Sequence, residues 1–171
     1  MPQTDKKRKR IWFRKEGLCL KALVLSDSHR DFGSILRAME QEQKVDLIIH
    51  AGDVQQDVDD IMDMWPQCPC AYVLGNNDFS VFGVPGERLF TFGGKTIFLT
   101  HGHMYGVRTS SARVEQEAKK RGADICIFGH THCRVLEERD GFWLMNPGAA
   151  SRSYGVIEIL DGKVSIALRD N

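Results

Sequence analysis

The chain has 171 residues and a mass of 19.4 kDa, which is the size of one ordinary globular domain. Apolar residues make up 42% and charged residues 27% of it, a composition typical of folded proteins rather than disordered ones. Lys plus Arg equals Asp plus Glu at 23 each, so the formal net charge is zero, which argues against a nucleic-acid binder with a broad basic surface. The sequence has no run of about 18 apolar residues, so it predicts no membrane-spanning helix.

Residues 1–17 differ in composition from the rest of the chain. Lys6 to Arg10 form a block of like charge, and such blocks usually stay solvated. We therefore expect a basic, disordered N-terminal extension over residues 1–17 and a single domain over residues 18–171. A nuclear-localisation or nucleic-acid-binding segment is the alternative interpretation of the basic block, and Ile11 and Trp12 are apolar enough to pack on the domain.

The cysteines indicate a cellular compartment. There are five of them, an odd number with no regular spacing, and the basic N-terminus lacks the apolar core of a signal peptide. We therefore expect free thiols in a reducing cytoplasm.

The first half of the domain alternates apolar runs with helical patterns. Each apolar run predicts a buried strand, and each ends in a polar cluster. Asp31 is placed to cap the first helix, and Pro66 stops the second. The predicted strands cover residues 22–25, 45–51 and 71–74. The first predicted helix begins near residue 32, and apolar residues at positions 58, 61, 62 and 65 predict the second. This order of strand, helix, strand, helix, strand predicts a parallel sheet covered by helices.

The second half contains more hairpins. Gly93-Gly94 separates two strand patterns, 87–92 and 95–100, and Asp140-Gly141 and Asp161-Gly162 turn two further hairpins. Between them lie a helical stretch over residues 111–121 and a strand over residues 125–128. We predict an α/β fold in which two mixed β-sheets form a layered sandwich flanked by helices, with its site at the carboxyl ends of the strands.

The histidines are not scattered. All of them lie at the ends of predicted strands, beside acidic and amide side chains in the same kind of position. In an extended chain, residues i and i+2 point the same way, so Asp27 with His29, and His130 with His132, can each present two ligands together. Glycines at these corners provide the permissive backbone that a tight turn needs. The histidines are His29, His50, His101, His103, His130 and His132, and the neighbouring residues are Asp27, Asp53, Asn76 and Asp78.

The chemistry of these side chains indicates metal binding. Imidazole and carboxylate without clustered thiolates suit Mn, Fe, Zn, Ni or Co better than Ca or Mg. Seven of these side chains are candidate ligands, which are too many for one tetrahedral ion, so they favour two divalent ions that share a bridging carboxylate. The seven are Asp27, His29, Asp53, Asn76, His101, His130 and His132.

Five ordered segments resemble the calcineurin-like metallophosphoesterases. They are Asp27-Ser28-His29, Gly52-Asp53, Gly75-Asn76-Asn77-Asp78, Thr100-His101-Gly102-His103 and Gly129-His130-Thr131-His132. The short chain and the segment Asn146-Pro147-Gly148-Ala149 are further similar to the small YfcE-type phosphodiesterase branch. The resemblance runs from about Lys21 to about Leu168 and implies the metallo-dependent phosphatase fold.

The resemblance also implies a ligand set and a reaction. Asp27, His29 and His132 would hold one metal, Asn76, His101 and His130 the other, and Asp53 would bridge them. Manganese is the ion we expect most, and the reaction would be attack of a metal-bridging hydroxide on a phosphodiester, with monoesters as further substrates. Two divalent ions, two carboxylates and one hydroxide leave a net positive centre that attracts phosphate.

One position departs from the wider family. Many larger members carry His directly after the Asn ligand, and Asn77 in that place cannot act as an acid. We nevertheless place His103, Asn77 and Asp78 among the catalytic residues. His103 is taken as the substitute general acid, with a substrate contact or a supporting hydrogen bond as its alternatives, and Asp78 as a residue that orients a neighbour. His50 is expected to support ligands rather than bind metal. Arg30, Arg108 and Arg152 could clamp phosphate, although solvent-facing charges are the simpler interpretation.

Two other functions are compatible with parts of the pattern. The retromer-subunit branch of the same fold serves as a protein-interaction scaffold with an altered metal site, whereas all seven ligand positions are filled here. A redox or regulatory metal protein is the other alternative, and the absence of a thiolate cluster argues against it. We expect a small phosphorylated substrate, no membrane partner and no stable nucleic-acid partner; the natural substrate and self-association into a homo-oligomer are left open.

Overall fold

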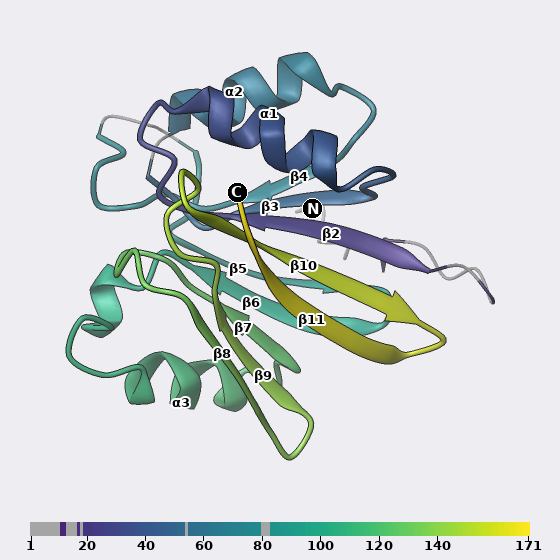
Figure 1. The fold of residues 1–171 in the computed structure, drawn as a ribbon. Coiled ribbons are helices and arrows are strands. Elements are labelled where there is room, and N and C mark those ends of the chain that lie inside the picture. The colour runs from purple at the N-terminus through teal and green to yellow at the C-terminus, as the bar shows by residue number, and fades with distance from the viewer. Residues whose placement is uncertain (1–10, 13–16, 18, 54, 80–82) are drawn as a thin grey trace, which may run out of the picture.

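The computed structural model describes residues 11–12, 17, 19–53, 55–79 and 83–171. Two β-sheets pack face to face, with helices on both outer faces (Figure 1). The layered α/β sandwich expected from the sequence is confirmed. Within this described part, no helix is long and apolar enough to cross a membrane.

One sheet has five strands in the order β11-β10-β2-β3-β4. β2, β3 and β4 run parallel, as the first half of the sequence predicts, and β10 pairs antiparallel with both β2 and β11. The outer face carries α1 and α2 (Figure 1). The bounds are Leu20–Leu25 for β2, Phe32–Gln41 for α1, Leu47–His50 for β3, Gln55–Met64 for α2, Cys70–Tyr72 for β4, Ser153–Leu160 for β10 and Lys163–Asp170 for β11.

The other sheet has six strands in the order β1-β5-β6-β7-β9-β8. Its outer face carries α3, and the single-turn 3-10 helix η1 lies between β6 and α3 along the chain. The bounds are Ile11–Trp12 for β1, Glu87–Phe92 for β5, Lys95–Thr100 for β6, His103–Tyr105 for η1, Ala112–Lys120 for α3, Ile125–Ile127 for β7, Val135–Arg139 for β8 and Phe142–Asn146 for β9.

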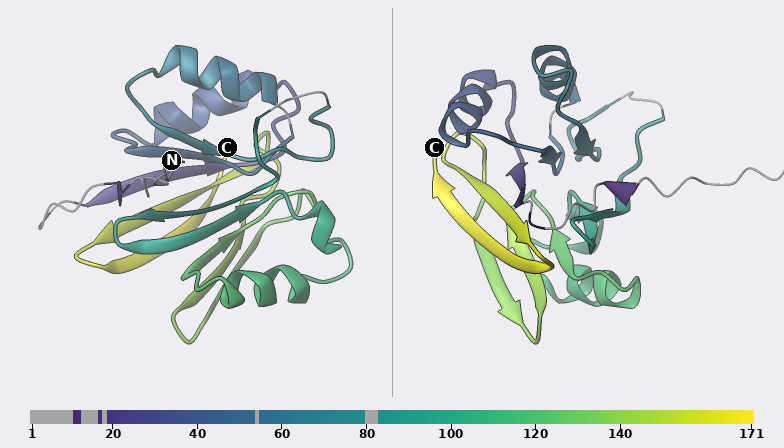
Figure 2. Two further views of the ribbon diagram at one scale, coloured as in Figure 1. Left: turned by 180° about the vertical axis from the view of Figure 1, so that it is seen from behind. Right: turned by 90° about the vertical axis from the view of Figure 1, so that its right-hand side faces the viewer.

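The central strands of both sheets are buried on both faces, which explains their continuous apolar runs. In β2, Ala22 and Val24 pack between the sheets, whereas Leu23 and Leu25 face α1 and α2. In the other sheet, the Phe98 side chain packs in the cluster beneath α3. Successive residues of a strand point to opposite faces, so a strand covered on both sides needs apolar residues at every position. Figure 2 shows the resulting layers of helix, sheet, sheet and helix.

The ends of the first two helices follow the predicted signals. Asp31 caps α1, and its carboxylate accepts a hydrogen bond from the Ser34 N–H at 3.2 Å. α2 ends at Met64, two residues before Pro66. Most of the expected extension, residues 1–10 and 13–16, lies outside the described residues; Ile11–Trp12 form β1 and pair in parallel with β5.

Candidate metal centre

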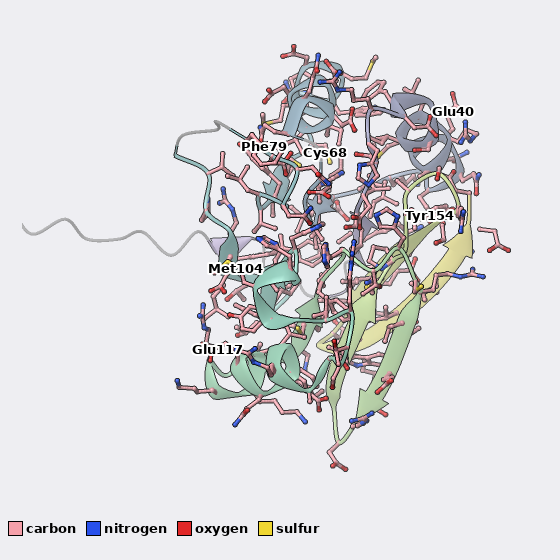
Figure 3. The ribbon with its side chains drawn as sticks, turned by 90° about the vertical axis from the view of Figure 1, so that its left-hand side faces the viewer. Glu40, Cys68, Phe79, Met104, Glu117 and Tyr154 are labelled. Atoms are coloured by element: carbon pink, nitrogen blue, oxygen red, sulfur yellow. The ribbon has the colours of Figure 1, made fainter. Side chains whose placement is uncertain are left out.

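The seven predicted ligands come together at one edge of the sandwich. They lie on five loops, which follow β2, β3, β4, β6 and β7. Parallel strands end at the same edge of a sheet, so their loops meet there. Figure 3 views the molecule from this side. The loops carry, in chain order, Asp27 and His29, then Asp53, then Asn76, then His101, then His130 and His132.

The first group consists of Asp27, His29 and His132, whose ligand atoms lie within 4.8 Å of one another. The His132 Nε2 is 3.2 Å from Asp27 Oδ1 and also 3.2 Å from His29 Nε2. The carboxylate is buried, whereas both imidazoles are exposed. This group can therefore hold an ion that substrate reaches from solvent.

The second group consists of Asp27, Asp53 and His101, all buried, with ligand atoms again within 4.8 Å. The His101 Nδ1–H donates to the Ala51 carbonyl at 2.7 Å, so in a neutral ring the lone pair is on Nε2. That Nε2 is 3.1 Å from Asn76 Oδ1, 3.5 Å from Asp53 Oδ2 and 3.9 Å from Asp27 Oδ1.

The arrangement of these atoms favours a bound cation, because without one the converging acceptor atoms repel one another. Asp27 Oδ1 is buried and accepts no hydrogen bond from any described residue, an arrangement that carries a desolvation penalty. It faces imidazole nitrogens from both groups, and lone pairs that converge in this way repel unless a positive charge lies among them. The mixture of carboxylate and imidazole donors suits divalent transition metals and does not select one of them.

The two histidines after β7 diverge. His132 joins His29 and Asp27, whereas the His130 ring lies 5.1 Å from the His101 ring, centroid to centroid. The expectation that residues i and i+2 present two ligands together is confirmed for Asp27 and His29 but wrong for His130 and His132. The extended backbone expected for both pairs is also wrong, because these residues have positive φ. The φ values are 51° for Asp27, 48° for His29, 67° for His130 and 58° for His132.

Backbone strain is concentrated at this site. Asp53, at φ 50°, joins the four residues above, so five of the seven predicted ligands are left-handed without being glycine. Such a conformation costs on the order of 1–3 kcal/mol per residue and persists only where surrounding contacts hold it. Strain of this kind clusters at functional sites, which supports a role for these loops beyond folding.

Asn77 and Asp78 hold Asp53 in place. The Asn77 backbone N–H and Nδ2 donate to the two Asp53 carboxylate oxygens, at 2.9 and 2.5 Å. The Asp78 carboxylate accepts hydrogen bonds from the backbone N–H groups of Asp53, Gly75 and Gln55, at 3.0, 2.6 and 2.6 Å. Both residues were predicted among the catalytic ones; their contacts make them positioning residues.

Gly75 and Gly129 are needed for space rather than for a left-handed backbone. A Cβ at Gly75 would lie 1.9 Å from Asp53 Oδ1, and one at Gly129 would lie 1.9 Å from Ser26 Oγ and 2.8 Å from Asp27 Oδ2. Gly52, by contrast, does have positive φ, at 99°. The loops therefore approach the ligand carboxylates so closely that a side chain would displace them.

His103 lies beside the ligands but on a different kind of element than predicted. It begins the 3-10 helix η1 instead of ending a strand. Its ring is 5.5 Å from that of His101 and 6.1 Å from that of His130, and its buried Nδ1 has no hydrogen-bond partner among the described residues. Burial, and next the nearby His101, lower the pKa of His103.

The three arginines near the site are all exposed. Arg108 is close enough to His130 for its charge to contribute, after burial and His101, to lowering the pKa of that imidazole. Among the described residues, the side chains of Arg30 and Arg152 make no hydrogen bond or ion pair with a predicted ligand.

Sequence reasoning missed three buried residues that support the loops. Ser28 and Asp57 bond to each other at 2.6 Å, and the Asn146 Nδ2 donates to the Gly129 carbonyl at 2.9 Å. Asn146 belongs to a segment that the family resemblance singled out, which was a usable signal. No sequence signal distinguished Asp57, because it lies in an acidic helix and the sequence does not separate it from the other carboxylates there.

Comparison with known proteins places the chain in a family. The model of the calcineurin-like phosphoesterase superfamily domain matches residues 20–161, so the chain belongs to this superfamily. It is 31% identical over 162 residues to "Probable metallophosphoesterase YsnB" of Bacillus subtilis, a match that covers 88% of this chain and 91% of that protein. It is 29% identical over 153 residues to "Phosphodiesterase MJ0936" of Methanocaldococcus jannaschii, covering 75% and 83% of the two chains.

Solved structures agree on the fold. A Streptococcus pneumoniae protein described as a predicted phosphoesterase has a TM-score of 0.73 at 25% identity, with 90% of each chain covered. Vps29 from Entamoeba histolytica has a TM-score of 0.71 at 20% identity, covering 89% of this chain and 99% of that one. The resemblance to metal-dependent phosphoesterases expected from the sequence is confirmed, and the likeness to Vps29 shows the fold alone.

Proposed function

We propose that this protein is a dinuclear metal-dependent phosphoesterase that hydrolyses phosphodiesters, with monoesters as further substrates. The observation that carries the proposal is the buried, unpartnered Asp27 Oδ1, which lies between imidazole nitrogens of two groups. Asp27, His29 and His132 would hold one ion, and Asn76, His101 and His130 the other, with Asp53 between them. Manganese is the ion we propose first, and iron, zinc, nickel and cobalt fit the same donors.

The chain's own residues would orient the substrate around these ions. When bound, divalent metals grip phosphoryl oxygens and lower the pKa of a coordinated water towards about 7. His29 and His132 leave one side of the site open to solvent, and the exposed Arg108 brings a positive charge near His130. His103 projects from η1 beside the same cluster, where it could protonate or hydrogen-bond a leaving oxygen.

Two exposed apolar side chains next to the ligand segments support a preference for diesters over monoesters. Phe79 and Met104 are the two most exposed large hydrophobic side chains among the described residues, at 79% and 64%. Each follows a ligand segment directly, and Figure 3 shows both on the side of the molecule that carries the site. A second ester group on phosphorus could cover them, whereas a monoester offers only charged oxygen there.

A non-catalytic scaffold is the competing proposal, since the Vps29 structures have the same fold. The complete set of seven donors supports the enzyme. The two proposals differ in a simple measurement, because a scaffold can bind metal without turning over any ester.

Removing metal tests the proposed function. Treatment with a chelator should abolish hydrolysis of a bis-aryl phosphodiester, and adding Mn²⁺ back should restore it, with two ions bound per chain. A matched aryl monoester should be hydrolysed more slowly by the same preparation. Diester hydrolysis that survives complete metal removal, or two bound metals without turnover of either ester, would contradict the proposal.

Replacing Arg108 with Ala should raise KM about tenfold at low ionic strength and leave kcat nearly unchanged. A charged hydrogen bond to phosphate contributes about 1.5–3 kcal/mol, and exposure and salt reduce that contribution. Steady-state kinetics at two salt concentrations would measure the effect, with Arg37→Ala, an exposed arginine on α1, as the matched control. Equal KM values for both variants would show that Arg108 does not contact substrate.

We also propose a cytoplasmic protein that acts on a small phosphorylated compound. Every one of its five cysteines is a free thiol, and burial raises the pKa of Cys70 to about 12, so that this thiol is poorly reactive. The balanced charge is in keeping with a small substrate rather than a membrane surface or nucleic acid. Sedimentation would decide whether the chain forms a homo-oligomer.

A further inference from the structure

A buried chain of hydrogen bonds joins the loops after β2 and β3 beneath the candidate metal centre. The Gly52 N–H donates to His50 Nδ1 at 3.2 Å, and His50 Nε2 is 3.0 Å from Ser28 Oγ. The Ser28 hydroxyl donates to Asp57 Oδ2 at 2.6 Å, and the same oxygen accepts the Arg30 backbone N–H at 2.9 Å. The side chains of His50, Ser28 and Asp57 are no more than 2% exposed.

The direction of every hydrogen bond in this chain is determined. A carboxylate only accepts, so the Ser28 hydroxyl must donate to Asp57 and can accept only from His50. The backbone N–H of Gly52 only donates, so His50 Nδ1 must accept. His50 is therefore the neutral tautomer with its proton on Nε2. Burial lowers the pKa of His50, in agreement with a neutral ring.

The two ends of this series of hydrogen bonds lie next to the proposed ligands. Ser28 stands between Asp27 and His29, and Gly52 directly precedes Asp53. All three ligands have positive φ, which is uncommon for residues other than glycine, although Asp and His adopt it more often than most. Two backbone bonds also join these loops, Asp27 N–H to the Gly52 carbonyl at 3.0 Å and His29 N–H to the Asp53 carbonyl at 3.4 Å, and the second is long.

We propose that His50, Ser28 and Asp57 are positioning residues that hold the two ligand loops at the separation that the metal centre requires. This inference rests on the proposed function, since it presupposes that Asp27, His29 and Asp53 bind metal. His50 is central because its two nitrogens bond to different loops. Removing the ring would break the side-chain link between the two loops and leave the two backbone bonds to hold them together.

Metal affinity separates this role from ordinary core stability. His50→Phe keeps a ring but removes both hydrogen bonds, and Asp57→Leu removes the acceptor; each should weaken Mn²⁺ binding about 10–100-fold. Asp57→Asn should stay within about threefold of the native affinity, because a single oxygen accepts both bonds and an amide oxygen can replace it. Titration of the metal-free variants with Mn²⁺ measures the affinities, and thermal unfolding shows that each variant is folded.

Tyr154→Phe is the matched control. The Tyr154 side chain, labelled in Figure 3, is also buried, and its hydroxyl bonds to Gln41 and Glu42 at the C-terminal end of α1, at 3.0 and 3.2 Å, rather than to a ligand loop. This variant should lower the melting temperature and leave Mn²⁺ affinity within about threefold of the native value. If it weakens Mn²⁺ binding as much as His50→Phe does, or if folded His50→Phe binds Mn²⁺ like the native protein, the positioning role is overturned.

A measurement on the native chain is independent of how the variants fold. Imidazole ¹⁵N shifts of the metal-free protein should identify His50 as the Nε2–H tautomer, and an Nδ1–H tautomer or an imidazolium would overturn the inference. Failure of the proposed function would look different, because the native protein would then bind no Mn²⁺, or bind two ions without hydrolysing either ester, while His50 still showed the Nε2–H tautomer.

Discussion

Asp53→Asn should remove most of the bound metal and most of the hydrolytic activity together. The substitution keeps the shape of the side chain but removes the negative charge proposed to lie between two cations. A charge pair about 4 Å apart is worth about 4 kcal/mol at an effective dielectric constant of 20. Since about 1.4 kcal/mol is a tenfold change in affinity, we expect metal binding to weaken by roughly two to three orders of magnitude. Metal analysis and diester hydrolysis on one preparation measure both losses.

Asn77→Ala is the control that separates charge from hydrogen bonding. Asn77 donates its side-chain N–H to Asp53, so the alanine variant loses that bond while the Asp53 charge stays. Its effect should be smaller, about 10–100-fold, which is typical for a residue that orients a metal ligand. If Asp53→Asn kept two metals per chain and near-normal turnover, Asp53 would not be the bridging ligand.

The parts of the fold set by local pattern could be predicted from the sequence. The runs that become β2 and β3 are apolar at nearly every position because both faces of their sheet are buried, and the Asp31 cap begins α1 as expected. The partner of β10 could not be predicted. This strand lies between β11 and β2, so a hairpin at the C-terminus joins the sheet built by the first half of the chain. Nothing in a local alternation of apolar residues specifies such a distant neighbour.

The candidate site could likewise be predicted only in part from the sequence. Its proposed ligands stand in ordered segments, and the family resemblance identifies them without a structure. The left-handed backbone of His29 and Asp53 could not be predicted, because most Asp and His residues do not adopt it even though they do so more often than other residues with a side chain. Asp57 was missed for a related reason, since packing alone distinguishes a buried carboxylate from the exposed ones on the same helix.

His103→Ala should reduce hydrolysis of esters with poor leaving groups by about 10²–10⁴-fold, the usual contribution of a general acid. The proposed ligand set is complete without His103, so the variant should still bind two metals. Its ring lies beside those of His101 and His130, and its buried Nδ1 has no partner among the described residues, so a hydrogen bond to substrate would complete its environment.

The leaving group decides between the possible roles of His103. An alkyl alcohol must be protonated as it departs, whereas a nitrophenolate needs no proton, so loss of a general acid should nearly spare nitrophenyl esters. Equal losses on both classes with metal intact would make His103 a residue that positions phosphate. Loss of metal would make His103 a ligand or a support for His101. It lies two residues after His101, at the start of η1. In either of those cases the proton would have to come from water or another side chain, because the amide of Asn77, at the position after Asn76, is not an acid.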